Sequence, residues 1–131
     1  MKFKIKSSIP EDIQDVLNYI LGKPHKGDYD GVYFTDNGYG ADIDQWFPGK
    51  EEPKTHKVEF DIDYHAYQER EPAAYDWQHV VYDEAEVNFI YVVKIDGVEV
   101  NERLERNSEF YNMVHDEFQK NYEPDGPMED F

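Results

Sequence analysis

An alternating row of acidic side chains is the feature of this sequence best suited to chemistry. Residues 57–67 read KVEFDIDYHAY and place apolar and polar residues in turn, which is the period of a β-strand with two different faces. The apolar face would enter a core. The polar face would carry Glu59, Asp61, Asp63 and His65. The row therefore predicts a strand that presents carboxylates to a binding partner.

The spacing of this row suits a partner that normally binds phosphates. Residues two apart on a strand lie about 6.6 Å apart. Neighbouring phosphates of a nucleic-acid strand are comparable, since they rise about 3.4 Å along the axis and lie further apart along the winding backbone. We expect acids from later in the chain to extend the surface, namely Asp83, Glu84, Glu86, Glu99 and Glu102. Tyr67 and Trp46 complete the predicted partner-binding set, because Tyr and Trp anchor protein interfaces beside charges that steer encounter.

A metal site is an alternative interpretation of the same row. Two carboxylates and an imidazole suit Zn, Mn or Fe, and Asp61, Asp63 and His65 share one predicted strand face. His56 or His79 could approach from elsewhere. Acidic strands also place Asp beside His by chance, and the twelve-residue spacing of a calcium loop is missing. We therefore predict no metal and no other cofactor, and keep a metal-binding domain or metal-dependent enzyme as an alternative.

Catalytic motifs are missing from the sequence. There is no cysteine, which excludes disulfides, thiolate metal sites and cysteine nucleophiles. No Gly-x-Ser-x-Gly motif occurs, and the segment 38–40, Gly-Tyr-Gly, lacks the third glycine of a dinucleotide-binding loop. Carboxylates are so abundant that some pair always looks suitable for acid–base catalysis. We predict a protein that is not an enzyme and has no catalytic residues.

The net charge is large and unevenly distributed. The 131 residues carry a net charge of −17, whereas solubility alone requires a magnitude of only about 2 to 8. Residues 58–131 hold most of the excess acids. Such a field disfavours direct binding to nucleic acid or to an anionic membrane. It favours a basic protein as partner.

These observations predict a small acidic inhibitor that occupies the basic cleft of a nucleic-acid-handling protein. In charge and size the chain is similar to DNA-mimic inhibitors of phages and mobile elements, such as anti-restriction and anti-CRISPR proteins, although it carries no family motif. An immunity protein that neutralises a basic nuclease toxin would use the same physics and stays as an alternative. The protein could be a monomer or a dimer.

The N-terminal sequence, MKFKIKSS, contains no continuous apolar region and does not predict a secretion signal. No run of the sequence approaches transmembrane length. We therefore expect a cytoplasmic protein, in the host cytoplasm if it is phage-encoded.

The order of predicted elements is typical of an α+β domain. We expect one domain over residues 1–122, followed by an acidic tail at 123–131. Helices are predicted at about 9–21 and 108–121, packed on one face of an antiparallel sheet of about four to six strands. A capping box of Ser8 and Glu11 would begin the first helix, and Ser108 or Asn107 would cap the second.

Predicted strands are less regular than the helices. We expect them at about 1–5, 32–34, 57–67, 77–82, 85–95 and 98–100, with a polar turn at 68–72 and a tight Asp96-Gly97 turn. For 41–43 a short strand is an open alternative to loop. Residues 22–54 are rich in Gly, Pro and Asp and are predicted to be mainly loop. A loop of that length indicates either a functional surface or missed elements.

Overall fold

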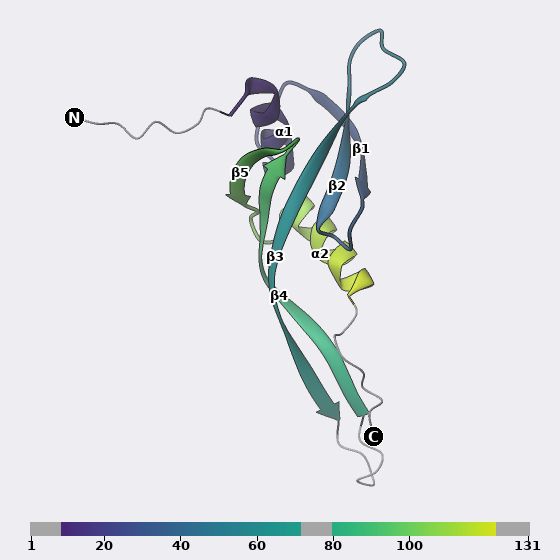
Figure 1. The fold of residues 1–131 in the computed structure, drawn as a ribbon, viewed down its shortest axis with the longest axis vertical. Helices are drawn as coiled ribbons and strands as arrows, with labels where there is room; N and C mark the ends of the chain where they lie inside the picture. Colours follow the sequence, from purple (N-terminus) through teal and green to yellow (C-terminus); the bar gives the residue numbers. More distant parts are fainter. Residues whose placement is uncertain (1–8, 72–79, 123–131) are drawn as a thin grey trace, which may run out of the picture.

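Two helices cover one face of a five-stranded antiparallel sheet (Figure 1). The computed structural model describes residues 9–71 and 80–122. The sheet order is β1-β2-β3-β4-β5, so each strand pairs with its neighbour in the sequence. This confirms the predicted α+β class. The elements are α1 (Glu11–Leu21), β1 (Asp28–Phe34), β2 (Gly40–Trp46), β3 (Lys54–Glu71), β4 (Val80–Ile95), β5 (Val98–Arg103) and α2 (Glu109–Asn121).

Helix α1 ends as predicted but begins differently. Gly22 terminates it in the left-handed conformation with φ 74°, which glycine adopts without steric cost. At the other end Pro10 occupies the N-cap position, and no side chain caps the helix. The predicted capping box is therefore wrong in its placement. The buried residues of α1 are spaced three or four apart, as expected for one apolar face of a helix: Ile13, Val16, Leu17 and Ile20.

Helix α2 confirms its sequence signals. The Ser108 hydroxyl accepts a hydrogen bond from the Tyr111 backbone N–H at 3.3 Å, which satisfies one of the free amides of the first turn. Phe110, Val114 and Phe118 are buried against the sheet. The helix therefore contributes one apolar stripe to the core.

The predicted loop at 22–54 contains two strands, β1 and β2, each longer than the apolar segments at 32–34 and 41–43. The register of β1 against β2 shifts between Tyr29 and Val32, where Gly31 has φ 97°, so β1 contains a bulge. The turn between the strands uses Asn37 and Gly38, both with positive φ. A Cβ on Gly38 would lie 3.0 Å from the Phe118 backbone nitrogen. The glycine therefore lets this turn approach α2 closely.

Strands β3 and β4 form a long ribbon that extends beyond the helices (Figure 1). Their pairing continues as far as Glu71 opposite Val80. The predicted turn at 68–72 is therefore wrong for residues 68–71, which belong to β3. The two strands predicted at 77–82 and 85–95 are one strand from Val80 onward. Pairing along the ribbon overrides the polar composition that suggested a turn, because strand preference depends strongly on context.

The turn between β4 and β5 is the predicted two-residue turn. Asp96 and Gly97 have φ values of 51° and 82°, which matches the turn type that follows the twist of paired strands. The register of β5 shifts once, and Asn101 there has φ 47°. Both edge strands of the sheet, β1 and β5, therefore contain an irregularity.

The core lies between the sheet and the two helices. Strand side chains that face the helices are buried, among them Ile43, Val58, Phe60, Ile62, Ile90, Val92 and Ile95. Neither helix of the described segments is long and apolar enough to cross a membrane. The predicted strand at 1–5, residues 77–79 of the next predicted strand and the tail at 123–131 lie outside the described residues.

Candidate binding surface

The sheet face opposite the helices carries the predicted acidic row. Along β3 the exposed Glu59, Asp61 and Asp63 alternate with the buried Val58, Phe60 and Ile62. Successive strand residues point to opposite faces, so the carboxylates lie together on the face that no helix covers. The strand thereby presents a row of negative charge to its surroundings.

The neighbouring strands add further acids to this face. Glu59 pairs with Lys94, which in turn pairs with Glu99, and His65 pairs with Glu86. Directly opposed residues of an antiparallel pair share a face. On β2, Asp42 pairs with Lys57 in the same way. We define the open face by the residues Asp42, Asp44, Lys57, Glu59, Asp61, Asp63, His65, Glu86, Phe89, Tyr91, Lys94, Glu99 and Arg103.

Acids outnumber bases on the open face, and Lys57 and Lys94 lie opposite acids in the register without forming close ion pairs with them. Among the described residues, a single ion pair joins a lysine to a carboxylate: Lys54 Nζ lies 3.5 Å from Asp12 Oδ2, and neither residue belongs to this face. The Arg103 guanidinium lies 5.1 Å from the centre of the Phe89 ring, a cation–π arrangement. The Phe89 side chain is 40% exposed. An apolar ring thus lies on the same face as the carboxylates.

The remaining predicted residues lie on the ribbon and on β5. The structure describes Tyr67 and two acids of the ribbon by backbone pairing, Tyr67 with Glu84 and Gln68 with Asp83. Glu102 pairs with Val92, whose side chain is buried beneath the helices, so the register places Glu102 on the other side of the sheet from Glu99.

Trp46 is remote from the acidic row. Glu59 pairs with Gly40 at one end of β2, and Trp46 is at the opposite end. That length of strand is roughly 20 Å. Trp46 follows Asp44 by two residues on β2, so it lies at the end of the open face that is furthest from Glu59.

The proposed metal ligands do not converge. Within the described segments, no group of three or more His, Asp or Glu side chains is arranged to hold a metal ion. His65 lies beside Glu86 instead, with Nε2 3.6 Å from Oε2, and its Nδ1 is 3.4 Å from the Asn88 side-chain amide. Asp61, Asp63 and His65 therefore follow one another along the exposed face of β3 and do not point toward a common centre.

Sequence reasoning missed a group of acids with structural partners at the other end of the molecule. Asp15 of α1 accepts hydrogen bonds from the backbone N–H groups of Lys26 and Gly27, both at 2.7 Å, and from the Tyr29 hydroxyl at 2.6 Å. Burial raises the pKa of Asp15, but these three hydrogen bonds and the nearby His25 outweigh it and lower the pKa below its ordinary value. Asp15 thereby ties α1 to the start of β1.

A buried histidine was missed as well. The His56 side chain is fully buried; it donates its Nδ1–H to Asp96 Oδ2 at 2.6 Å, and its Nε2 lies 2.8 Å from Gln45 Oε1. Asp96 also accepts a hydrogen bond from the Lys57 backbone N–H at 2.8 Å. One signal could have found this histidine, because His56 continues the buried series of β3 two residues before Val58.

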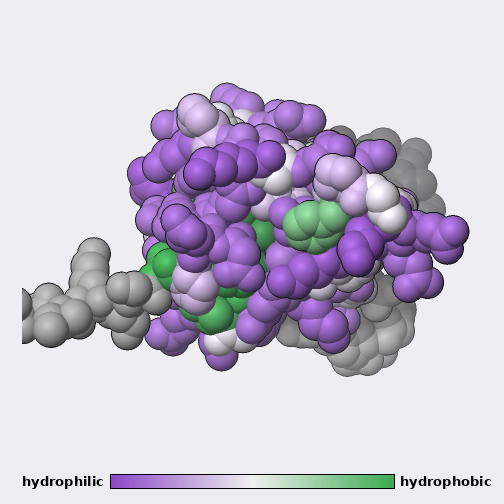
Figure 2. All heavy atoms as spheres, turned by 90° about the horizontal axis from the view of Figure 1, so that it is seen from above, coloured by the Kyte–Doolittle hydropathy of each residue, from purple (hydrophilic) through white to green (hydrophobic). Residues whose placement is uncertain are grey.

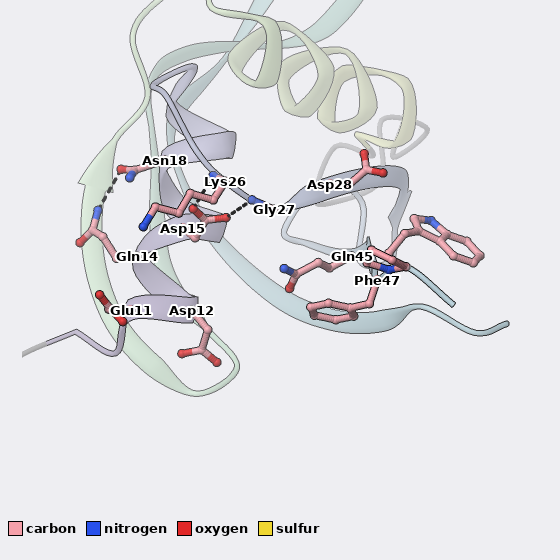
Figure 3. Close-up of a pocket in the computed structure, with 12 residues that line it drawn as sticks. Glu11, Asp12, Gln14, Asp15, Asn18, Lys26, Gly27, Asp28, Gln45 and Phe47 are labelled. Atoms are coloured by element: carbon pink, nitrogen blue, oxygen red, sulfur yellow. Dashed lines mark hydrogen bonds between the residues drawn. The ribbon is translucent and has the colours of Figure 1, made fainter. Parts of the chain in front are cut away.

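A cavity of about 740 Å³ opens beside these residues, between α1 and the adjacent ends of β1 and β2. Figure 3 shows Glu11, Asp12 and Asp15 on the helix side and Asp28 and Phe47 on the strand side. Trp46 also lines it. Figure 2 views the molecule from above, where hydrophilic side chains surround a limited apolar area. This volume is within the range of small-ligand sites, about 300–1,000 Å³.

Comparison of the chain with family models, with curated proteins and with solved structures finds no match.

Proposed function

We propose that this protein inhibits a nucleic-acid-handling protein by occupying its basic cleft with the open face. The observation that carries the proposal is the row of exposed carboxylates Glu59, Asp61 and Asp63, extended by Glu86 and Glu99 on neighbouring strands. Lys94 lies opposite Glu59 and Glu99 in the register, but in the described part of the chain none of these carboxylates forms a close ion pair with a lysine or arginine. A basic cleft that normally holds phosphates would supply those partners.

The physical basis of the proposal is competition for the same cations. Lysine and arginine side chains that bind phosphate also bind carboxylate, and arginine does so through two parallel hydrogen bonds. The open face is a nearly continuous sheet surface, so it can present several carboxylates at once to a groove. Net charge of this size also accelerates encounter with a basic partner.

Aromatic side chains give this surface an apolar contact. Phe89 is 40% exposed and lies opposite Asp63 in the register, while Tyr91 lies opposite Asp61. Interfaces draw much of their affinity from a few desolvated aromatic residues. We therefore assign Phe89 the anchoring role on the open face.

The first experiment identifies and then tests a target. The protein is used to capture partners from a bacterial lysate at low salt and again at high salt, and each captured nucleic-acid-binding protein is purified. Fluorescence anisotropy then measures whether this protein displaces a labelled duplex from it. We expect displacement that weakens at least tenfold between roughly 50 and 200 mM salt, because charge pairs dominate the contact.

A pair of variants with equal charge change locates the contact. The triple variant Glu59→Gln/Asp61→Asn/Asp63→Asn should weaken displacement by roughly tenfold or more. The control Glu51→Gln/Glu52→Gln/Glu105→Gln removes the same charge from exposed loop positions and should change it little. Equal effects of the two variants, or an affinity that does not depend on salt, would contradict binding through the open face.

A further inference from the structure

Seven carboxylates run in single file across the side of the sheet that no helix covers. They belong to four neighbouring strands, and each of them is exposed or half-buried. We define the carboxylate file by Asp28 on β1, Asp44 and Asp42 on β2, Glu59, Asp61 and Asp63 on β3, and Glu86 on β4. Within one strand, neighbours in the file are two residues apart, which is about 6.6 Å. Each strand therefore contributes a short segment of the file.

The strand register joins these segments end to end. Three pairs of acids are diagonal neighbours on adjacent strands: Asp28 with Asp44, Asp42 with Glu59, and Glu86 with Asp63. Such neighbours lie about 7–8 Å apart, close to the step within a strand. Contacts with opposed residues support this placement, since the Thr55 hydroxyl donates to Asp44 Oδ1 at 2.9 Å and His65 Nε2 lies 3.6 Å from Glu86 Oε2. The file thus keeps an even step from β1 to β4.

The positions opposite the carboxylate file carry no acid. Opposed residues of an antiparallel pair share a face. In the order of the file they are Trp46, Thr55, Tyr33 with Lys57, Gly40 with Lys94, Tyr91, Phe89 and His65. Glu99 lies one strand beyond Lys94, and the strand residues two away from it, Gly97 and Asn101, are uncharged. The described strands therefore present one line of carboxylates and no second line parallel to it.

Aromatic rings occupy four of the opposed positions, namely Trp46, Tyr33, Tyr91 and Phe89. Tyr33 is 59% exposed and Phe89 is 40% exposed. The ring centres of Phe89 and Tyr91 are 6.3 Å apart, and the Arg103 guanidinium lies over the Phe89 ring. The file therefore has rings beside it at several of its steps.

A single strand of nucleic acid has the same two components. It presents one line of phosphates and, beside that line, bases whose faces are free to stack on aromatic side chains. A duplex presents two lines of phosphates, separated by grooves about 6 and 12 Å wide, and keeps its bases inside the stack. Grooves that bind single strands cover about 4–16 nucleotides, and seven carboxylates fall within that range. The file matches a single strand in each of these respects.

We propose that the carboxylate file takes the place of one nucleic-acid strand, and that the partner is a protein whose groove binds single strands. The inference rests on the proposed function and names the class of its target. Lysines and arginines of the groove would pair with successive carboxylates of the file. Aromatic side chains that normally stack on bases would contact Phe89 and Tyr33.

The test compares two probes on the same targets. Each nucleic-acid-binding protein captured for the duplex assay is given a labelled oligothymidylate and a labelled duplex of the same length, and fluorescence anisotropy follows both. We expect a target to bind the single strand roughly tenfold or more tightly than the duplex. The protein should displace the single strand completely, with an inhibition constant equal to its directly measured dissociation constant for the target.

Charge variants test whether the β2 segment of the file is used. Asp42→Asn/Asp44→Asn should raise the inhibition constant against the single strand roughly fivefold, and the new amide oxygen can still accept from Thr55. The control Glu102→Gln/Glu105→Gln removes the same charge from exposed positions outside the file and should change the constant little. Far-UV circular dichroism shows whether each variant remains folded.

Ring variants test the contact beside the file. Phe89→Ala should raise the inhibition constant against the single strand roughly fivefold, because a stacked ring is lost. The control is Phe47→Ala, since Phe47 is similarly exposed at 42% but lines the cavity beside α1. It should change the constant little.

The outcomes separate this inference from the proposed function. Displacement of the duplex without displacement of the single strand would refute the single-strand partner and leave the proposed function standing. Equal effects of Asp42→Asn/Asp44→Asn and its control, or of Phe89→Ala and its control, would also overturn the inference. Capture of no nucleic-acid-binding protein, or displacement of neither probe, would refute the proposed function itself.

Discussion

Carboxylates beside the cavity and in the turn between β4 and β5 differ from those of the open face in what surrounds them. At the cavity end, Asp15 accepts hydrogen bonds from two backbone amides and from the Tyr29 hydroxyl, and Asp96 in the turn between β4 and β5 likewise accepts from the Lys57 backbone amide and from His56. On the open face, Asp61 and Asp63 are exposed and pair with aromatic residues of β4 rather than with bases. Aspartate therefore has two roles in this protein. The hydrogen-bonded aspartates stabilise the fold, and the exposed aspartates of the open face are available to a partner.

This difference separates stability from binding. Removing an acceptor of buried or partly buried hydrogen bonds leaves donors without partners and costs free energy of folding. Removing an exposed carboxylate from a strongly negative surface reduces repulsion instead. Variants of the hydrogen-bonded groups and variants of the open-face carboxylates should therefore move the unfolding free energy in different directions.

The largest effect is expected for His56→Ala. The substitution empties a fully buried position and leaves Asp96 and Gln45 without their partner, so we expect a loss of roughly 3 kcal/mol in the free energy of unfolding. Urea denaturation followed by far-UV circular dichroism measures it. The control is His65→Ala on the open face, where the side chain is 54% exposed and no measurable loss is expected. Equal losses of unfolding free energy in His56→Ala and His65→Ala would contradict the expected difference between the buried and the exposed histidine.

The next effect is expected for Asp15→Asn. The amide accepts hydrogen bonds less strongly than the carboxylate and adds donors toward Lys26 and Gly27, so the loss should be roughly 1–3 kcal/mol at neutral pH. The same urea titration measures the loss, and Asp63→Asn provides the exposed control.

The stability lost in Asp15→Asn should depend on pH, because folding lowers the pKa of the Asp15 carboxylate. The Asp15 pKa lies below its ordinary value of 3.8 in the folded protein. Its stabilising contribution is therefore present above that value and is lost as pH falls through the lower folded pKa. The difference between wild type and Asp15→Asn should stay constant from neutral pH to about pH 5 and shrink below about pH 4. A difference that grew on acidification would contradict this sign.

The smallest effect on stability is expected on the open face. The variant Glu59→Gln/Asp61→Asn/Asp63→Asn should keep its urea midpoint or raise it by roughly 0.2–0.5 M at low ionic strength, because repulsion among the carboxylates decreases. Added salt should reduce the increase, since screening already weakens the repulsion. A clear fall in the midpoint would show that these acids support the fold.

Local signals in the sequence predicted those parts of the fold that local chemistry decides. The helix ends at Gly22, Ser108 caps α2 and Asp96-Gly97 turns the chain, because each depends on a few adjacent residues. The acidic row was predictable for the same reason, since strand alternation is a property of consecutive residues.

Other features depend on partners distant in the chain. Strand β1 contains Asp and Gly, and its pairing with β2 decides its conformation. The contact of His56 with Asp96 joins residues 40 positions apart, and Asp15 reaches Gly27 across a loop. No pattern of adjacent residues predicts such contacts, and the cavity that Asp15 and Gly27 line was therefore not predicted.

The irregular edge strands described above bear on how the protein behaves at high concentration. A row of unpaired amides and carbonyls at the border of a sheet can template the addition of further chains. Here the bulge near Gly31 and the kink at Asn101 interrupt those rows, and acids accompany them on β1 and β5. An incoming copy would meet mismatched hydrogen-bonding groups and like charge together, which guards the molecule against fibre growth.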